Sequence, residues 1–202
     1  MNTATRPLRI AVADDERDTR QFFEEFLPRL GHEVVAATED GRQLVEKCRQ
    51  VRPDLVITDV KMPEMDGIQA AAAINHEREL PVILLTGHHD ADTLGRAAAD
   101  HVMAYLSKPA KPVDLQAAIA LAILRFAHYQ ALKREAADLR QALEDRKVIE
   151  RAKGTVMRRL GLDEPEAFHR LQKQATSQNR KLIEVAREIL QADEVFQALQ
   201  GR

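Results

Sequence analysis

The stretch DLVITDVKMPEMDG (residues 54–67) begins with a short apolar run that ends at Asp59 and passes into an acidic loop. Similar apolar runs occur at residues 8–13, 33–37, 81–86 and 104–107, and each is followed by a helical pattern. Continuous apolar strands that alternate with helices are typical of a parallel sheet covered on both faces, because parallel strands need crossover connections. The sequence therefore predicts a doubly wound α/β domain with a five-stranded parallel sheet over residues 1–125.

The segment after Pro112 has a different pattern. It contains no glycine before Gly154 and no further proline before residue 161, which predicts one long helix or two abutting ones. Apolar residues alternate there at spacings of three and four, as in a coiled-coil seam: Tyr129, Leu132, Ala136, Leu139 and Leu143. We expect a coiled-coil-like helical linker at residues 126–145 and a homodimer through residues 129–143. A helix that packs against its own chain is the alternative.

Two further helices are expected at the C-terminus. Gly161 ends the long helix, and Asp163 with Glu166 three residues later has the spacing of a helix N-cap. This second helix runs to about Ser177, and an apolar stripe that begins at Leu182 indicates a third. We therefore expect an all-α three-helix domain over residues 146–202.

Composition indicates a cytoplasmic protein with two domains. Of the 202 residues, 45% are hydrophobic and 31% are charged, which suits packed cores and excludes a wholly disordered chain. No apolar run approaches the roughly 20 residues needed to span a bilayer, and two acids follow the first residues too closely for a signal peptide. We expect no membrane segment. The single cysteine, Cys48, excludes an intramolecular disulfide, and we expect it to be buried and structural.

Charge is distributed unevenly along the chain. Residues 1–125 carry 15 basic and 20 acidic side chains, whereas residues 126–202 carry 15 and 12. Within residues 146–190 the balance is 11 basic to 6 acidic. This excess indicates an anionic partner for the C-terminal part, and surface solubility is the alternative explanation.

Chemistry-bearing residues follow the predicted strands. Asp14 and Asp15 follow the first strand, Asp59 the third, Thr86 ends the fourth and Lys108 follows the fifth. Because ligands of doubly wound sheets lie at the carboxyl ends of the strands, we expect these residues on one rim. Three carboxylates there need a hard divalent cation such as Mg²⁺. A strand-end Asp with a metal, a lysine and a hydroxyl provides what phosphoryl transfer to a carboxylate requires, with Asp59 as the nucleophile.

The motifs VADDE (12–16), TDVKMPEMDG (58–67) and YLSKP (105–109) closely resemble the receiver domain of bacterial response regulators, which has a flavodoxin-like fold. The resemblance implies phosphorylation of Asp59 by a sensor histidine kinase. It also implies Mg²⁺ binding through Asp14, Asp15, Asp59 and the carbonyl of Lys61, and a switch formed by Thr86, Tyr105 and Lys108. The Lys108–Pro109 peptide is then expected to be cis.

We expect no enzymatic activity beyond slow hydrolysis of the aspartyl phosphate. Phosphatases of the haloacid dehalogenase type need a second Asp two positions after the nucleophile, and Lys61 stands there. We interpret the adjacent His88 and His89 as exposed loop residues rather than metal ligands. His101 stands where receiver domains usually have a small residue, so helix four is expected to be irregular.

Residues 146–190 resemble the ANTAR domain of transcription antiterminators, through RKVIERAKGTVMRRLGLDEPEAFHRLQKQA (146–175) and RKLIEVAREIL (180–190). The resemblance implies binding to hairpin RNA in nascent transcripts and antitermination. The basic residues expected to contact RNA are Lys153, Arg158, Arg159, Arg170, Lys173, Arg180 and Lys181. A DNA-binding output domain and a dimerisation or protein-interaction module are the alternatives. Phe168, Leu171 and Ala175 share one helical face and are expected in the core.

Overall fold

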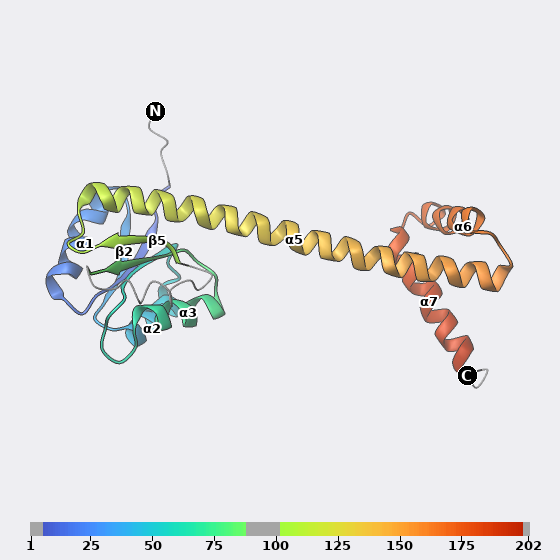
Figure 1. Ribbon diagram of the computed structural model, residues 1–202, viewed down its shortest axis with the longest axis horizontal. Coiled ribbons are helices and arrows are strands. Elements are labelled where there is room, and N and C mark those ends of the chain that lie inside the picture. Colours follow the sequence, from blue (N-terminus) through green and yellow to red (C-terminus); the bar gives the residue numbers. More distant parts are fainter. Residues whose placement is uncertain (1–5, 88–101, 200–202) are drawn as a thin grey trace, which may run out of the picture. The chain divides into compact units, whose positions relative to one another are not determined.

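The computed structural model describes residues 6–87 and 102–199, and the chain forms two compact units, residues 1–130 and 131–202. The first unit contains a five-stranded, all-parallel sheet with strand order β2-β1-β3-β4-β5 (Figure 1). Its strands are β1 (Arg9–Ala13), β2 (Glu33–Thr38), β3 (Leu55–Asp59), β4 (Val82–Thr86) and β5 (Val102–Ser107). This order is that of the flavodoxin-like doubly wound fold, which confirms the predicted fold class.

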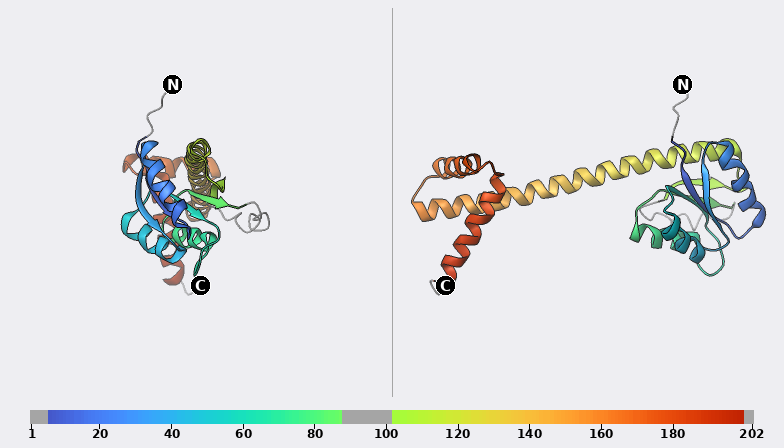
Figure 2. Two further views of the ribbon diagram at one scale, coloured as in Figure 1. Left: turned by 90° about the vertical axis from the view of Figure 1, so that its left-hand side faces the viewer. Right: turned by 180° about the vertical axis from the view of Figure 1, so that it is seen from behind.

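Helices cover both faces of the sheet. Those of the first unit are α1 (Arg17–Arg29), α2 (Gly41–Val51), α3 (Gly67–Glu77) and the beginning of α5 (Pro112–Leu160). On one face, Phe23 and Leu27 of α1 pack with Leu115 and Ile119 of α5 against alternate strand residues. On the other face, α2 and α3 pack against the remaining strand residues, as both views in Figure 2 show. The central strand β3 is buried along its whole length, so Asp59 extends from a rigid element.

Cys48 lies in α2 on the side that faces the core, as expected. Its thiol is free and buried, and burial raises the pKa of Cys48 to about 12. A thiol with this pKa stays protonated and unreactive at neutral pH. Cys48 is therefore a core residue.

Helix α5 is continuous over 49 residues, so the first of the two sequence-based alternatives is correct. Within the described part of the chain it is the one helix that is long and apolar enough to cross a membrane, with a mean hydropathy of 1.2 over 18 residues. This result rests on length and composition only. Leu115, Ile119 and Ala122 of α5 are buried against the sheet, and core packing of this kind accounts for apolar residues in the helix.

The residues of the expected coiled-coil seam differ in their surroundings. Tyr129 packs against the core of the first unit, stacked with Phe126 at a centroid distance of 6.4 Å. The first compact unit accordingly extends to Gln130, five residues beyond the predicted boundary after residue 125. The leucines of the seam differ from Tyr129: the exposed fractions of Leu132, Leu139 and Leu143 are 65%, 61% and 60%. These three leucines are therefore largely exposed in the described part of the chain.

The second unit consists of the end of α5, α6 (Glu164–Ser177) and α7 (Leu182–Leu199). Gly161, with a φ of 65°, follows the last residue of α5, and Asp163 caps α6 by accepting a hydrogen bond from the backbone N–H of Glu166. Val156, Ala167, Leu171, Ala175 and Val185 form the core between the three helices. The three helices and the burial of Leu171 and Ala175 are as predicted. The expectation for Phe168 is wrong: its exposed fraction is 36%, and it lies outside the core of the three helices.

Candidate functional site

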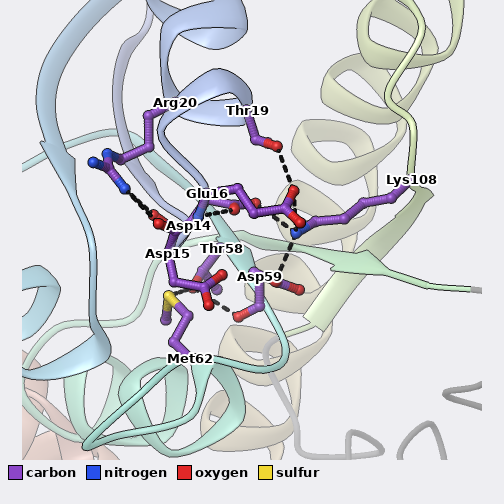
Figure 3. A network of polar contacts seen from close by, with 9 residues as sticks. All are labelled: Asp14, Asp15, Glu16, Thr19, Arg20, Thr58, Asp59, Met62 and Lys108. Carbon is purple, nitrogen blue, oxygen red and sulfur yellow. Dashed lines mark hydrogen bonds and ion pairs between the residues drawn. The ribbon is translucent and has the colours of Figure 1, made fainter.

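Three carboxylates gather at the carboxyl end of the sheet. Asp14 and Asp15 follow β1 and Asp59 ends β3, and one oxygen of each lies within 4.8 Å of the others (Figure 3). Asp14 and Asp59 are buried, whereas Asp15 is exposed to solvent. The structure thus brings together the three acidic residues that the strand-end rule selected.

Lys108 supplies the positive charge opposite these acids. Its ammonium nitrogen lies 2.7 Å from Oδ2 of Asp59, 2.9 Å from Oδ2 of Asp14 and 3.7 Å from Oε2 of Glu16 (Figure 3). Burial alone lowers the pKa of Lys108, but the hydrogen bonds to Asp59 and Asp14 outweigh burial and raise this pKa above its ordinary value. The lysine is therefore fully charged at neutral pH.

One positive charge does not balance three carboxylates. Burial raises the pKa of Asp14, although hydrogen bonds from Lys108 and from the backbone of Glu16 act in the opposite direction. Oδ2 of Asp14 is buried, and within the described residues it contacts the Lys108 ammonium at 2.9 Å but accepts no backbone hydrogen bond. An oxygen-only ligand set with one under-satisfied buried oxygen and an exposed Asp15 fits a hard divalent cation that keeps several waters.

The loop after β3 is held close to Asp59 by Gly67. A β-carbon at residue 67 would lie 1.9 Å from the carbonyl oxygen of Asp59, so only glycine fits. The N–H of Gly67 donates to the carbonyl of Val60, and Asp66 caps α3 through a reciprocal capping box with Gln69. Lys61, whose carbonyl is the expected fourth ligand, lies exposed in this loop two residues after Asp59.

The expected switch residues lie on β4 and β5. Thr86 is the last residue of β4 and is half-buried, and Tyr105 of β5 is 42% exposed. The peptide between Lys108 and Pro109 is cis, as predicted. The expectations for His88, His89, His101 and helix four concern residues outside those that the structure describes.

Sequence reasoning did not single out two residues that hold the acidic loop. The backbone N–H of Glu16 donates to Oδ1 of Asp14 at 2.9 Å, and Nη1 of Arg20 donates to the carbonyls of Asp14 and Asp15 at 2.7 and 3.0 Å (Figure 3). Arg20 lies one turn into α1, so a basic residue five or six positions after an acidic pair was the available signal. These contacts fix the backbone that carries both carboxylates.

Comparison with known proteins assigns the family. The family model of the response regulator receiver domain matches residues 10–120, and that of the ANTAR domain matches residues 137–190. The chain is a response regulator with an ANTAR domain. It is 41% identical over 188 residues to the transcriptional regulatory protein PdtaR of Mycobacterium tuberculosis, a match that covers 93% of this chain and 92% of PdtaR.

Solved structures resemble the receiver domain of this response regulator. The receiver domain of a modulated diguanylate cyclase from Desulfovibrio desulfuricans superposes with a TM-score of 0.56 at 26% identity, covering 60% of this chain and 97% of that one. A receiver domain protein from Clostridium thermocellum gives a TM-score of 0.54 at 34% identity, covering 58% and 94%. The comparisons confirm both resemblances: the N-terminal domain resembles receiver domains, and the C-terminal domain resembles ANTAR domains.

Four of the basic residues expected to contact RNA are held in ion pairs within the ANTAR domain. Lys153 is buried, and its ammonium contacts Glu150 and Glu164 at 2.6 and 2.7 Å. Arg159 contacts buried Asp193 at 2.6 Å, and its guanidinium lies 5.6 Å from the ring centroid of Phe196. Arg170 pairs with Glu166, and Arg180 pairs with Glu184 and Glu188.

These pairs change the role that the structure assigns to the four residues. Lys153 in particular is 10% exposed at its side chain and joins α5 to α6, so it stabilises the domain. Arg187, a further basic residue of this domain, pairs with Asp145 of α5 at 3.2 Å. Arg158, Lys173 and Lys181 have no acidic partner within residues 6–87 and 102–199, and they remain candidates for RNA contact.

Proposed function

We propose that this response regulator is switched by phosphorylation of Asp59 and that its ANTAR domain binds hairpin RNA in nascent transcripts and causes antitermination. The single observation that carries the switch is the position of Asp59. Its carboxylate ends the central strand, beside two further carboxylates and 2.7 Å from the Lys108 ammonium. The phosphoryl donor is a sensor histidine kinase, and the protein acts in the cytoplasm.

In the proposed reaction an oxygen of Asp59 attacks the phosphorus of the phosphohistidine, and the bond from phosphorus to the histidine nitrogen breaks. Asp14, Asp15, Asp59 and the carbonyl of Lys61 would hold Mg²⁺, which supplies charge neutralisation for the transferring group. Lys108 exchanges its contact with the Asp59 carboxylate for one with the new phosphoryl oxygens. The chain lacks a second acid for hydrolysis at residue 61, so we propose an acceptor rather than an enzyme.

Thr86 and Tyr105 transmit this change in our proposal. Thr86 ends β4, the strand that pairs with β3, and we assign its hydroxyl to a phosphoryl oxygen of phosphorylated Asp59. Tyr105 of β5 is 42% exposed in this state, and we propose that its ring turns inward on phosphorylation. The surface around β5 and the start of α5 then differs between the two states, which provides a basis for control of the output domain.

RNA binding is supported by the ANTAR match and by unpaired basic side chains. Arg158 of α5, Lys173 of α6 and Lys181 before α7 are distributed over the whole domain rather than along one recognition helix. A distributed set of cations suits recognition of phosphates and of RNA shape better than base readout in a DNA groove. DNA binding is the competing outcome of the test below.

We further propose that the response regulator forms a homodimer through the exposed leucines of α5. Leu132, Leu139 and Leu143 are each at least 60% exposed and repeat at coiled-coil spacing. A second copy of the same helix offers the matching surface. Such a dimer presents two ANTAR domains, which fits a target with paired hairpins.

The test uses the full chain with and without acetyl phosphate and Mg²⁺. Wild type is expected to gain one phosphoryl group, whereas Asp59→Asn gains none. Phosphorylated wild type is expected to bind hairpin RNA at least 10-fold more tightly than duplex DNA of equal charge at moderate salt. Labelling of the Asp59 variant would refute the switch, and equal affinity for both nucleic acids would refute specific RNA binding.

A further inference from the structure

A polar groove lies between α5 and α7 in the ANTAR domain. It has a volume of about 560 Å³ and is lined on the α5 side by Arg151, Gly154, Thr155 and Arg158, and on the α7 side by Leu190, Glu194 and Gln197. A groove of this size accommodates a small organic group or a short piece of a polymer. Its α5 side carries the unusual features.

The glycine at residue 154 is unexplained by the fold. It lies in the interior of α5, where glycine is less favourable than alanine, and it does not have a positive φ. Packing does not require it either: an added β-carbon would meet only Nη1 of Arg158, at an ordinary contact distance of 3.7 Å. Within the described part of the chain an alanine would therefore fit at residue 154 without a clash.

Two arginines stand on either side of this open position. Arg151 and Arg158 are seven residues apart on α5, so they share one face of the helix and are separated by about 10 Å along its axis. Both side chains are exposed, and neither has an acidic partner among the residues with described positions. Arg158 is directed by a hydrogen bond of 3.2 Å from its Nη2 to the hydroxyl of buried Thr155.

The neighbouring charges are already neutralised. Glu150 and Asp193 border the groove, and they contact Lys153 at 2.6 Å and Arg159 at 2.6 Å. On the α5 side this leaves the two guanidinium groups as the unpaired charges, with Glu194 on the opposite α7 side. The α5 side thus favours an anion, and Glu194 keeps that anion away from α7.

We propose that this groove binds the sugar–phosphate backbone of RNA, with Arg151 and Arg158 paired to phosphates and the missing side chain at Gly154 allowing the strand to lie against α5. The inference rests on the proposed RNA-binding function and assigns it a site. Because glycine has no side chain, the RNA backbone can approach α5 closely at residue 154. The two arginines can each form bidentate contacts with a phosphate. Neither Arg151 nor Gly154 was among the RNA contacts expected from the sequence.

Gly154→Ala in the full chain gives the sharpest test, because fold and binding are expected to respond in opposite directions. Alanine raises helix propensity without a clash, so the melting temperature is expected to stay equal or rise by a few degrees. Affinity for a hairpin RNA is expected to fall at least 10-fold because the methyl group occupies the space of the strand. Gln172→Ala on the exposed face of α6 is the matched control and is expected to leave RNA affinity unchanged.

Arg151→Gln and Arg158→Gln give a second, independent measurement. Each is expected to weaken RNA binding by about 10-fold and to reduce the slope of log affinity against log salt by about 1. The proposed site would be overturned if Gly154→Ala kept wild-type affinity or if the arginine variants kept the wild-type salt slope. The proposed function would still hold in that case, because the wild-type protein binds RNA. Absence of RNA binding by wild type overturns both. Equal losses on duplex DNA would show a general phosphate site and overturn the assignment to RNA.

Discussion

The ammonium of Lys108 lies between two buried carboxylates, 2.7 Å from Asp59 and 2.9 Å from Asp14. Its positive charge would repel a Mg²⁺ ion bound by the same carboxylates. Lys108→Gln removes this charge. We expect tighter Mg²⁺ binding, by several-fold, because one repulsive charge is lost next to three carboxylates. Isothermal titration calorimetry measures the affinity, and Lys111→Gln, on an exposed side chain, is the control. Weaker Mg²⁺ binding by Lys108→Gln would contradict this account.

The same variant is expected to destabilise the metal-free receiver. Removing one partner of a largely buried ion pair leaves carboxylates uncompensated, and we expect a loss of about 2 kcal/mol or more in the free energy of unfolding. Saturating Mg²⁺ should restore most of that loss by binding the folded state. Urea unfolding with and without Mg²⁺ provides the measurement. A loss that Mg²⁺ does not reduce would show that the carboxylates are not its ligands.

Gly67→Ala is expected to disrupt the proposed phosphorylation site. The new methyl carbon would meet the Asp59 carbonyl oxygen at 1.9 Å, so the loop after β3 has to move. We expect a loss of more than about 2 kcal/mol in stability and slower labelling of Asp59 by acetyl phosphate. Gly31→Ala is the control: its φ of 85° is strained for alanine, but the added carbon meets nothing within 4 Å, so only about 1 kcal/mol is expected. Equal effects of the two changes would show that the close approach is unimportant.

Glu135 and Arg140 lie beside the exposed leucines in the sequence, and we expect them to set the orientation of the proposed dimer. With Leu132 and Leu139 at one core position of the heptad, residue 135 of one helix faces residue 140 of the other when the two helices are parallel. Glu135→Arg is expected to weaken a parallel dimer, and the double change Glu135→Arg with Arg140→Glu to restore it. Sedimentation equilibrium measures the dissociation constants. A double variant no stronger than the single one would exclude the parallel register.

His32 gives the receiver a pH dependence of known sign. Burial lowers the pKa of His32, and its Nδ1 accepts a hydrogen bond from the N–H of Leu8 at 3.3 Å. Because the unfolded chain takes up a proton near pH 6.5 and the folded chain does so only at lower pH, stability is lost as pH falls below 6.5. Urea unfolding between pH 7.5 and 5 measures this slope. His32→Gln should reduce the slope of unfolding free energy against pH. An unchanged slope would show that other histidines cause the pH dependence.

The acidic site could be predicted because topology alone creates it. Asp14, Asp59 and Lys108 are far apart in sequence, but each follows a strand of a parallel sheet, and the carboxyl ends of such strands share one rim. Burial of Leu171 and Ala175 was predictable for the same kind of reason, because helical periodicity marks a buried face.

The features that the sequence did not predict depend on contacts between segments that are distant in sequence. Arg159 and Asp193 lie on different helices, and no local pattern pairs them, so Arg159 was expected to be available for RNA. Tyr129 was ambiguous because a coiled-coil seam and a domain core both require an apolar residue. Only the structure shows that its ring packs on the receiver with Phe126.

The pairing of Arg159 affects how this protein should be divided for biochemistry. The ANTAR family match ends at residue 190, whereas α7 continues to Leu199 and carries both Asp193 and Phe196. A fragment cut at the family boundary would lose the two side chains that contact Arg159 and would present one additional free guanidinium to RNA. Its affinity would then fall more steeply with salt than that of the full chain, by about one phosphate contact. Fragments meant to report the native affinity should therefore retain α7 to its end.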